Sequence, residues 1–167
     1  MIRNFFTTLL FSLIVSLTYS QDFEITGLVL DEYKKPIQAD EPVFTGTERI
    51  LFVDDEPTLV TLGKATLESL GYKVVGRTRS EEALELFKEN PDQFDLVITD
   101  MTMPQMTGAQ FSKQLIEIRP DIPIVLCSGF SEKMTEEIAK EIGIREFFIK
   151  PIPRQVLSKI IRKVLDE

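Results

Sequence analysis

The sequence predicts an α/β domain built on a five-stranded, doubly wound parallel sheet with helices on both faces. From Glu48 onward, short apolar runs alternate five times with longer segments whose apolar residues have helical spacing. Three of these runs, at residues 50–53, 96–98 and 124–126, are continuously apolar, as expected of central strands buried on both faces. This alternation is typical of parallel sheets covered by helices.

The expected elements follow one another in order from residue 49. Strands are expected at 49–53, 73–77, 95–99, 123–127 and 146–149, and helices at 57–70, 80–89, 107–118, 131–142 and 153–165. Pro57 is suited to a first helical position, and Ser80 and Thr107 are suited to N-caps. Gly71 and Gly143 follow their helices as C-terminal stops.

The composition is that of one globular domain with a short extension. Hydrophobic residues make up 43% and charged residues 28% of the 167 residues. The net charge of −8 and the absence of a basic run argue against direct nucleic-acid binding. The chain has no histidine and one cysteine, Cys127, which excludes histidine metal sites, an internal disulfide and a phosphohistidine of its own.

The first 47 residues differ from the rest. Residues 1–20 resemble a secretory signal peptide, because Arg3 precedes an apolar stretch at 5–17 and small residues precede Gln21. That stretch is short for a spanning helix, which needs about 20 apolar residues, and an uncleaved membrane anchor is the alternative. Residues 21–47 are interpreted as a short β-like stretch and a linker without an assigned function, ahead of a domain at 48–167.

Polar side chains stand where the predicted strands end. In an open parallel sheet, ligands bind beyond the carboxyl ends of the strands. A lone acid there is commonly a helix cap or a solvated residue, so the joint placement carries the prediction. The residues that end four of the five strands are Asp54 and Asp55, Asp100, Ser128, and Lys150 with Pro151.

These residue types indicate phosphoryl-transfer chemistry. Three carboxylates at one edge repel one another, by about 4 kcal/mol for a pair 4 Å apart at an effective dielectric near 20. A hard divalent cation offsets that repulsion, and Mg²⁺ suits oxygen ligands with room for phosphate. Lys150 and Ser128 offer an ammonium and a hydroxyl to phosphate oxygens, and we expect the Lys150 head group to face a wet rim.

Residues 48–167 resemble the receiver domain of response regulators in bacterial two-component systems. The matching segments are Ile-Leu-Phe-Val-Asp-Asp-Glu-Pro at 50–57, Asp-Met-Thr-Met-Pro-Gln-Met-Thr-Gly at 100–108, Leu-Cys-Ser-Gly-Phe at 126–130 and Phe-Phe-Ile-Lys-Pro at 147–151. The resemblance implies a flavodoxin-like sheet in the order 2-1-3-4-5. The segment at 127–130 and the linker are similar to receivers found in hybrid sensor histidine kinases.

The resemblance implies a role for each matching residue. Asp100 would be the phosphoacceptor, with Asp55 binding Mg²⁺ directly, Asp54 acting through a metal-bound water, and the Thr102 backbone carbonyl as a further ligand. Ser128 and Lys150 would each contact a phosphoryl oxygen. The remaining positions are the aromatic switch Phe147, the loop residues Pro104 and Gly108, and Pro151, whose peptide bond with Lys150 is cis in the family.

The implied function is that of a phosphoacceptor in a phosphorelay. A histidine kinase or histidine phosphotransfer protein would donate to Asp100, and a conformational change would signal to an output partner that the sequence does not identify. Such a chain catalyses only its own phosphorylation and dephosphorylation. Two alternatives are weighed: a haloacid-dehalogenase-like phosphatase and a degenerate receiver that only binds partners. The phosphatase is disfavoured because that family carries its nucleophile in an Asp-x-Asp motif after the first strand, whereas this chain has adjacent aspartates there and an isolated aspartate after the third strand.

The sequence carries conflicting indications of localisation. A receiver is expected in the cytoplasm, where kinases and ATP are, with residues 1–20 as a membrane tether in one interpretation. The same residues also argue for export.

Overall fold

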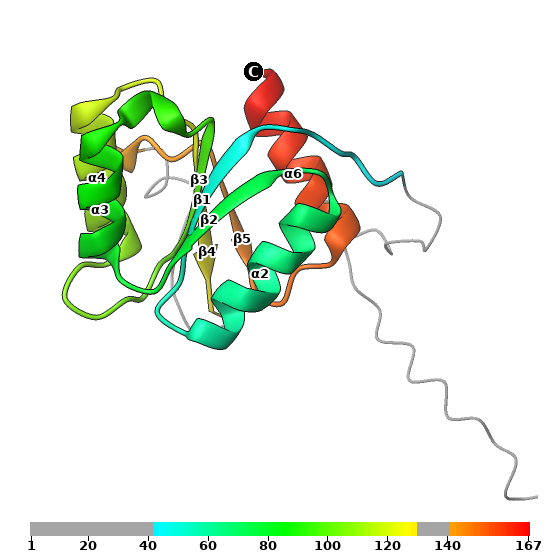
Figure 1. Ribbon diagram of the computed structural model, residues 1–167, viewed down its shortest axis with the longest axis horizontal. Helices are drawn as coiled ribbons and strands as arrows, with labels where there is room; N and C mark the ends of the chain where they lie inside the picture. The colour runs from blue at the N-terminus through cyan, green and yellow to red at the C-terminus, as the bar shows by residue number, and fades with distance from the viewer. Residues whose placement is uncertain (1–41, 130–140) are drawn as a thin grey trace, which may run out of the picture. The chain divides into compact units, whose positions relative to one another are not determined.

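A five-stranded parallel sheet forms the centre of the computed structural model, which describes residues 42–129 and 141–167 (Figure 1). The strand order is β2-β1-β3-β4-β5, and each neighbouring pair is parallel. The strands are β1 (Arg49–Val53), β2 (Lys73–Arg77), β3 (Leu96–Asp100), β4 (Ile124–Ser128) and β5 (Glu146–Ile149). The predicted fold class and strand order are confirmed.

Helices cover both faces of the sheet. They are α2 (Pro57–Ser69), α3 (Ser80–Glu89), α4 (Gly108–Ile118) and α6 (Arg154–Asp166), with a 3₁₀ turn η1 at Pro91–Gln93. Figure 1 shows α2 and α6 on one side of the sheet and α3 and α4 on the other. Within the two described ranges, no helix combines the length and apolar character needed to cross a bilayer. The predicted segment at 1–20, residues 21–41 of the predicted segment at 21–47, and most of the predicted helix at 131–142 lie outside the described residues.

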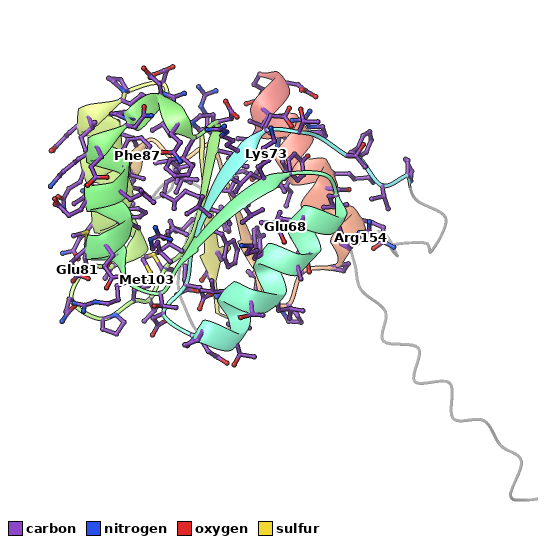
Figure 2. All side chains as sticks on the ribbon, viewed as in Figure 1. Glu68, Lys73, Glu81, Phe87, Met103 and Arg154 are labelled. Atoms are coloured by element: carbon purple, nitrogen blue, oxygen red, sulfur yellow. The ribbon has the colours of Figure 1, made fainter. Side chains whose placement is uncertain are left out.

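Two apolar layers fill the space between the sheet and its helices. Side chains of β1 alternate between them: Leu51 and Val53 join the layer under α3 and α4, whereas Ile50 and Phe52 join the layer under α2 and α6. Phe87 of α3, which is fully buried, lies between its helix and the sheet (Figure 2). Full burial of such a side chain contributes about 1.5–3 kcal/mol to the stability of the fold. Packing on both faces therefore holds the strands, and with them the strand ends, in place.

Most of the predicted helix ends are confirmed. Pro57 occupies the first turn of α2, and Thr107 caps α4 in a capping box in which Thr107 Oγ1 accepts from Gln110 N at 3.2 Å and Gln110 Oε1 accepts from Thr107 N at 3.0 Å. Gly71 and Gly143 have φ angles of 96° and 88°, the left-handed conformation that favours glycine after a helix.

The prediction that Ser80 caps α3 is wrong. Arg79 holds the N-cap position with extended backbone and no side-chain cap, and Ser80 is already helical. The Ser80 hydroxyl instead donates to the backbone carbonyl of Met106, 26 residues away, at 3.0 Å.

The strap, residues 42–48, is fixed to the domain ahead of β1. Phe44 N donates to Ser158 Oγ of α6 at 3.2 Å, and Gly46 N donates to the Leu70 carbonyl at 3.1 Å. The strap passes so close to Gly71 that a Cβ there would lie 2.5 Å from the Gly46 carbonyl oxygen. The strap is therefore a packed part of this unit rather than a free tether.

An ion pair closes the strap onto α6. Arg162 Nη2 donates to Glu48 Oε1 at 2.7 Å, and the Arg162 guanidinium lies 5.8 Å from the centroid of the buried Tyr72 ring. Burial alone would raise the pKa of Glu48, but hydrogen bonds from its own backbone amide, from Arg162 and from the Thr47 amide together lower it. The ionised form of Glu48 is thus favoured in the folded state.

Glu48→Gln should lower the free energy of unfolding by about 1 kcal/mol at neutral pH. A carboxyl whose pKa is lowered by folding contributes stability above its unfolded pKa of about 4.3, and that contribution is lost as pH falls through the folded value. Urea unfolding of both proteins should therefore show a gap at pH 7 that closes below about pH 4. Glu68→Gln is the control, because its 3.7 Å pair with Lys64 is exposed. A pH-independent gap would contradict this account.

Candidate functional site

The polar residues predicted to share a site meet at one edge of the sheet. Because β1, β3 and β4 are parallel neighbours and β5 lies beside β4, their carboxyl ends point the same way. This is the lower edge in Figure 1, where α2 begins, and Figure 2 labels Met103 of the β3–α4 loop beside it. Asp54 follows β1, Asp100 ends β3, Ser128 ends β4 and Lys150 follows β5.

Lys150 joins the two buried carboxylates. Its Nζ donates to Asp54 Oδ2 at 2.5 Å and to Asp100 Oδ1. The side chains of Asp54 and Asp100 are 2% and 11% exposed, and that of Lys150 is 26% exposed. The expectation that the Lys150 ammonium faces a wet rim is therefore wrong, because the ammonium is held between two acids.

The second oxygen of each carboxylate is held by the backbone. Asp54 Oδ1 accepts from Glu56 N at 3.0 Å, and Asp100 Oδ2 accepts from Thr102 N at 2.7 Å. Both acids are two residues before their backbone donors, an arrangement in which a short polar side chain closes a turn at the strand end. The turns after β1 and β3 thus orient the two carboxylates towards Lys150.

Burial and charge act against each other in this group. Burial raises the pKa of Asp100, and the hydrogen bond and charge of Lys150 offset only part of that rise. Burial alone would lower the pKa of Lys150, but hydrogen bonds to Asp100 and Asp54 outweigh it, so the pKa of Lys150 is raised. Lys150 therefore stays an ammonium, and two acids share its one positive charge.

The site has the donor chemistry of a magnesium site without the expected gathering of three acids. Asp55 is exposed, and across residues 42–129 and 141–167 no three His, Cys, Asp or Glu side chains are grouped as they would be around a metal ion. This corrects the expectation of three converging carboxylates. The two buried carboxylates, Asp54 and Asp100, exceed the single ammonium of Lys150 by one negative charge, and that charge is on carboxylate oxygens. An excess of negative oxygen ligands fits a hard divalent cation.

The loop after Asp100 is tight, as predicted from Pro104 and Gly108. Gly108 N donates to the Met101 carbonyl at 2.9 Å, and a Cβ at Gly108 would lie 2.0 Å from the Asp100 carbonyl oxygen. Gln105 between them has a φ of 67°, unusual for a residue with a side chain. Glycine at 108 therefore allows α4 to begin directly against the backbone of Asp100.

Ser128, Phe147 and Pro151 lie in or next to the last two strands of the sheet. Ser128 is buried at the end of β4, and its hydroxyl donates to the Gly129 carbonyl at 3.2 Å. Phe147 is half-buried against the apolar layer under α3 and α4. The Lys150–Pro151 bond is cis, as the resemblance implies. The roles of Ser128 as a phosphate ligand and Phe147 as a switch stay predictions.

Two residues lie near the site without a sequence signal that places them there. Cys127 is buried, as its apolar run predicts, but the run does not reveal that Cys127 lies opposite Asp100 in the β3–β4 register. Ser80 contacts the loop after Asp100 from α3, and a contact 26 residues apart leaves no local pattern.

Comparison with known proteins identifies the family. The family described as the response regulator receiver domain matches residues 50–162. The chain is 31% identical to the chemotaxis protein CheY of Thermotoga maritima over 118 residues, covering 70% of this chain and 97% of that protein. Other curated relatives are longer, and the chain spans between 18% and 47% of the rice and Bacillus subtilis regulators that it matches.

Solved structures show the same fold. A receiver domain protein from Clostridium thermocellum is 32% identical, with a TM-score of 0.68 over 71% of this chain and 94% of that one. The receiver domain of the sensor histidine kinase PA1611 from Pseudomonas aeruginosa, solved with a magnesium ion in its active site cleft, is 22% identical, with a TM-score of 0.65 over 73% of this chain and all of that one. With its strand order, edge site and family match, this chain belongs to the response regulator receiver domains of two-component systems.

Proposed function

We propose that the chain accepts a phosphoryl group on Asp100 from the phosphohistidine of a histidine kinase or histidine phosphotransfer protein. The observation that carries the proposal is the Lys150 ammonium held between the buried carboxylates of Asp54 and Asp100 at the carboxyl edge of the sheet. Phosphoryl transfer depends mainly on positioning and on charge stabilisation, and this group supplies both.

The transfer would form one bond and break one. A carboxylate oxygen of Asp100 attacks phosphorus, the phosphorus–nitrogen bond to the donor imidazole breaks, and the imidazole keeps the electron pair. The backbone amide of Thr102 holds the second Asp100 oxygen at 2.7 Å and so fixes the direction of the attacking one. Lys150, already bonded to Asp100, would pair with a transferring phosphoryl oxygen, and the Ser128 hydroxyl with another.

A magnesium ion would be held by Asp100 and the Thr102 carbonyl, by Asp54 through a bound water, and by Asp55, whose exposed side chain would turn towards the other ligands. It would add positive charge against the phosphoryl oxygens, in addition to that of Lys150. The surplus of acids over ammonium in the site supports this assignment, as does the magnesium described for the similar receiver domain of PA1611. The chain would catalyse only its own phosphorylation and dephosphorylation.

The phosphoryl group would also act as a signal. It adds roughly 1.5 to 2 negative charges and three acceptor oxygens beside Ser128 and Lys150. Both residues lie at the ends of neighbouring strands, β4 and β5, and Phe147 sits in β5 against the apolar layer. Movement of Ser128 towards the phosphate, with repacking of Phe147, would shift the population between two packings and change the surface offered to a partner.

Acetyl phosphate tests the proposal directly. With Mg²⁺ present, the full chain should gain one phosphoryl group by intact mass, the group should be removed by hydroxylamine as an acyl phosphate is, and peptide mapping should place it on Asp100. Addition of a chelator before the donor should prevent labelling. No labelling from acetyl phosphate or from a phosphorylated kinase domain, or a hydroxylamine-stable label on Ser128, would reject the proposal.

A further inference from the structure

The hydroxyl of Ser80 connects α3 to the loop that follows Asp100. Ser80 is 1% exposed, and its Oγ donates to the Met106 carbonyl at 3.0 Å. As the first residue of α3, Ser80 does not use this hydroxyl to cap its own helix. The buried hydroxyl therefore bonds to a loop 26 residues away and not to the backbone at the start of its own helix, which indicates that it stabilises the loop.

The loop has a conformation that needs outside support. Gln105 has a φ of 67°, and Met106 N donates to the Pro104 carbonyl only two residues back at 2.7 Å. A non-glycine residue in this region persists only where its surroundings fix it. Gln105 Oε1 accepts from Arg79 Nη2 at 3.5 Å. Arg79 and Ser80, the N-cap and first residue of α3, thus contact two consecutive loop residues.

The same loop orients the phosphoacceptor. Its first part supplies the Thr102 amide that holds Asp100 Oδ2 at 2.7 Å, and its end is closed by the bond from Gly108 N to the Met101 carbonyl at 2.9 Å. Because the loop is short and closed on itself, displacement of Met106 is transmitted to Thr102. A loss at Ser80 would therefore reach Asp100 through the backbone.

We infer that Ser80 is a positioning residue for phosphorylation: its hydroxyl fixes the loop that aims the Asp100 carboxylate. The inference rests on the proposed function, since it concerns the rate at which Asp100 is phosphorylated. Ser80 touches neither Asp100 nor the phosphoryl group, so its effect is on geometry alone. One hydrogen bond of this kind corresponds to a change of roughly three- to tenfold in rate.

The test compares buried serines in the full chain. Ser80→Ala should slow phosphorylation by acetyl phosphate with Mg²⁺ roughly three- to tenfold. Ser158→Ala is the matched control, because Ser158 is also buried and donates to a backbone carbonyl, that of Gln155, at 2.7 Å on α6. The control should lose stability without loss of rate. Amide NMR without any donor should show Thr102 and Met106 shifted in Ser80→Ala and unshifted in Ser158→Ala.

A second pair of variants separates the hydroxyl from folding. Ser80→Thr and Ser80→Val have side chains of similar size, but only the threonine variant keeps the hydroxyl donor. Asp100 should therefore be phosphorylated faster in Ser80→Thr than in Ser80→Val, by a similar factor. This comparison holds even if Ser80→Ala is unstable. Equal rates for this pair, with an unshifted Thr102 amide, would overturn the inference while the wild type is still labelled. An unlabelled wild type would instead reject the proposed function and the inference with it.

Discussion

Asp100→Asn should abolish phosphoryl uptake and leave the fold at least as stable as the wild type. An amide oxygen is a poor nucleophile and forms no stable acyl phosphate, so labelling by acetyl phosphate should disappear from the intact mass. The fold should tolerate the change because the buried site holds two acids and one ammonium. With asparagine at position 100, Asp54 and Lys150 remain as a balanced pair.

The stability difference should depend on pH in a defined direction. Burial raises the pKa of Asp100, so the contribution of this one carboxyl group to wild-type stability is greatest below the ordinary aspartate pKa and falls as pH rises through the raised value. The asparagine variant lacks this loss and should gain on the wild type as pH rises from about 3 to 7. Asp121→Asn is the control, since that side chain is 78% exposed. Labelling of Asp100→Asn at the wild-type level would show that another residue is the acceptor.

Lys150→Met should produce the largest loss of stability, because it leaves two buried carboxylates facing each other without a cation. Removing one partner of a buried ion pair costs about 3–5 kcal/mol, and the partial exposure of Lys150 places its loss near the lower end. Urea unfolding at neutral pH in the presence of a chelator should measure that loss. The difference from wild type should shrink on acidification, because protonation of the carboxylates removes their repulsion.

Magnesium should reverse much of the Lys150→Met effect. A ligand that binds only the folded state stabilises it according to its concentration and affinity, and a site without Lys150 has twice the surplus of acids for a cation to balance. The rise in melting temperature on adding Mg²⁺ should therefore be larger for Lys150→Met than for wild type. Lys88→Met, whose partner Glu85 is 70% exposed, should change little in either condition. A smaller Mg²⁺ effect in Lys150→Met would contradict the charge balance described here.

The two substitutions should also be strongly coupled. In the double variant Asp100→Asn with Lys150→Met, only Asp54 remains unpaired, so the loss of stability should be smaller than for Lys150→Met alone. Additive effects would mean that Lys150 and Asp100 act on stability independently.

The strands were predictable because burial on both faces leaves a plain sequence pattern, and their order was implied by the family resemblance. The bounds of β1, β2 and β5 agree with the expected ranges, whereas β3 and β4 each begin and end one residue later than expected. Asp95, the residue before β3, makes two hydrogen bonds with Arg49: its backbone N donates to the Arg49 carbonyl at 2.8 Å, and its Oδ2 accepts from Arg49 N at 2.7 Å. Pro91–Gln93, a short 3₁₀ turn, has no periodicity to detect.

The site residues were predictable, but their contacts were not. Strand ends and the family resemblance place Asp54, Asp100 and Lys150 at one edge, because parallel order determines which ends are neighbours. Neither reveals that Lys150 folds inward to bond both acids, since the rotamer of a long side chain depends on the charges that it meets. The misassigned Ser80 has a similar cause, because a cap and a long-range contact use the same residue type.

The reactivity of the Cys127 thiol can report on local opening at the centre of the sheet. Cys127 is the only cysteine in the sequence, it is 1% exposed, and it lies opposite Asp100 in the register of β3 and β4. Burial raises the pKa of its thiol well above the usual value, so the closed domain should resist alkylating reagents. Each alkylation event would then record a transient separation of the strands beside the phosphoacceptor, and the reaction rate with a thiol reagent measures how often that opening occurs.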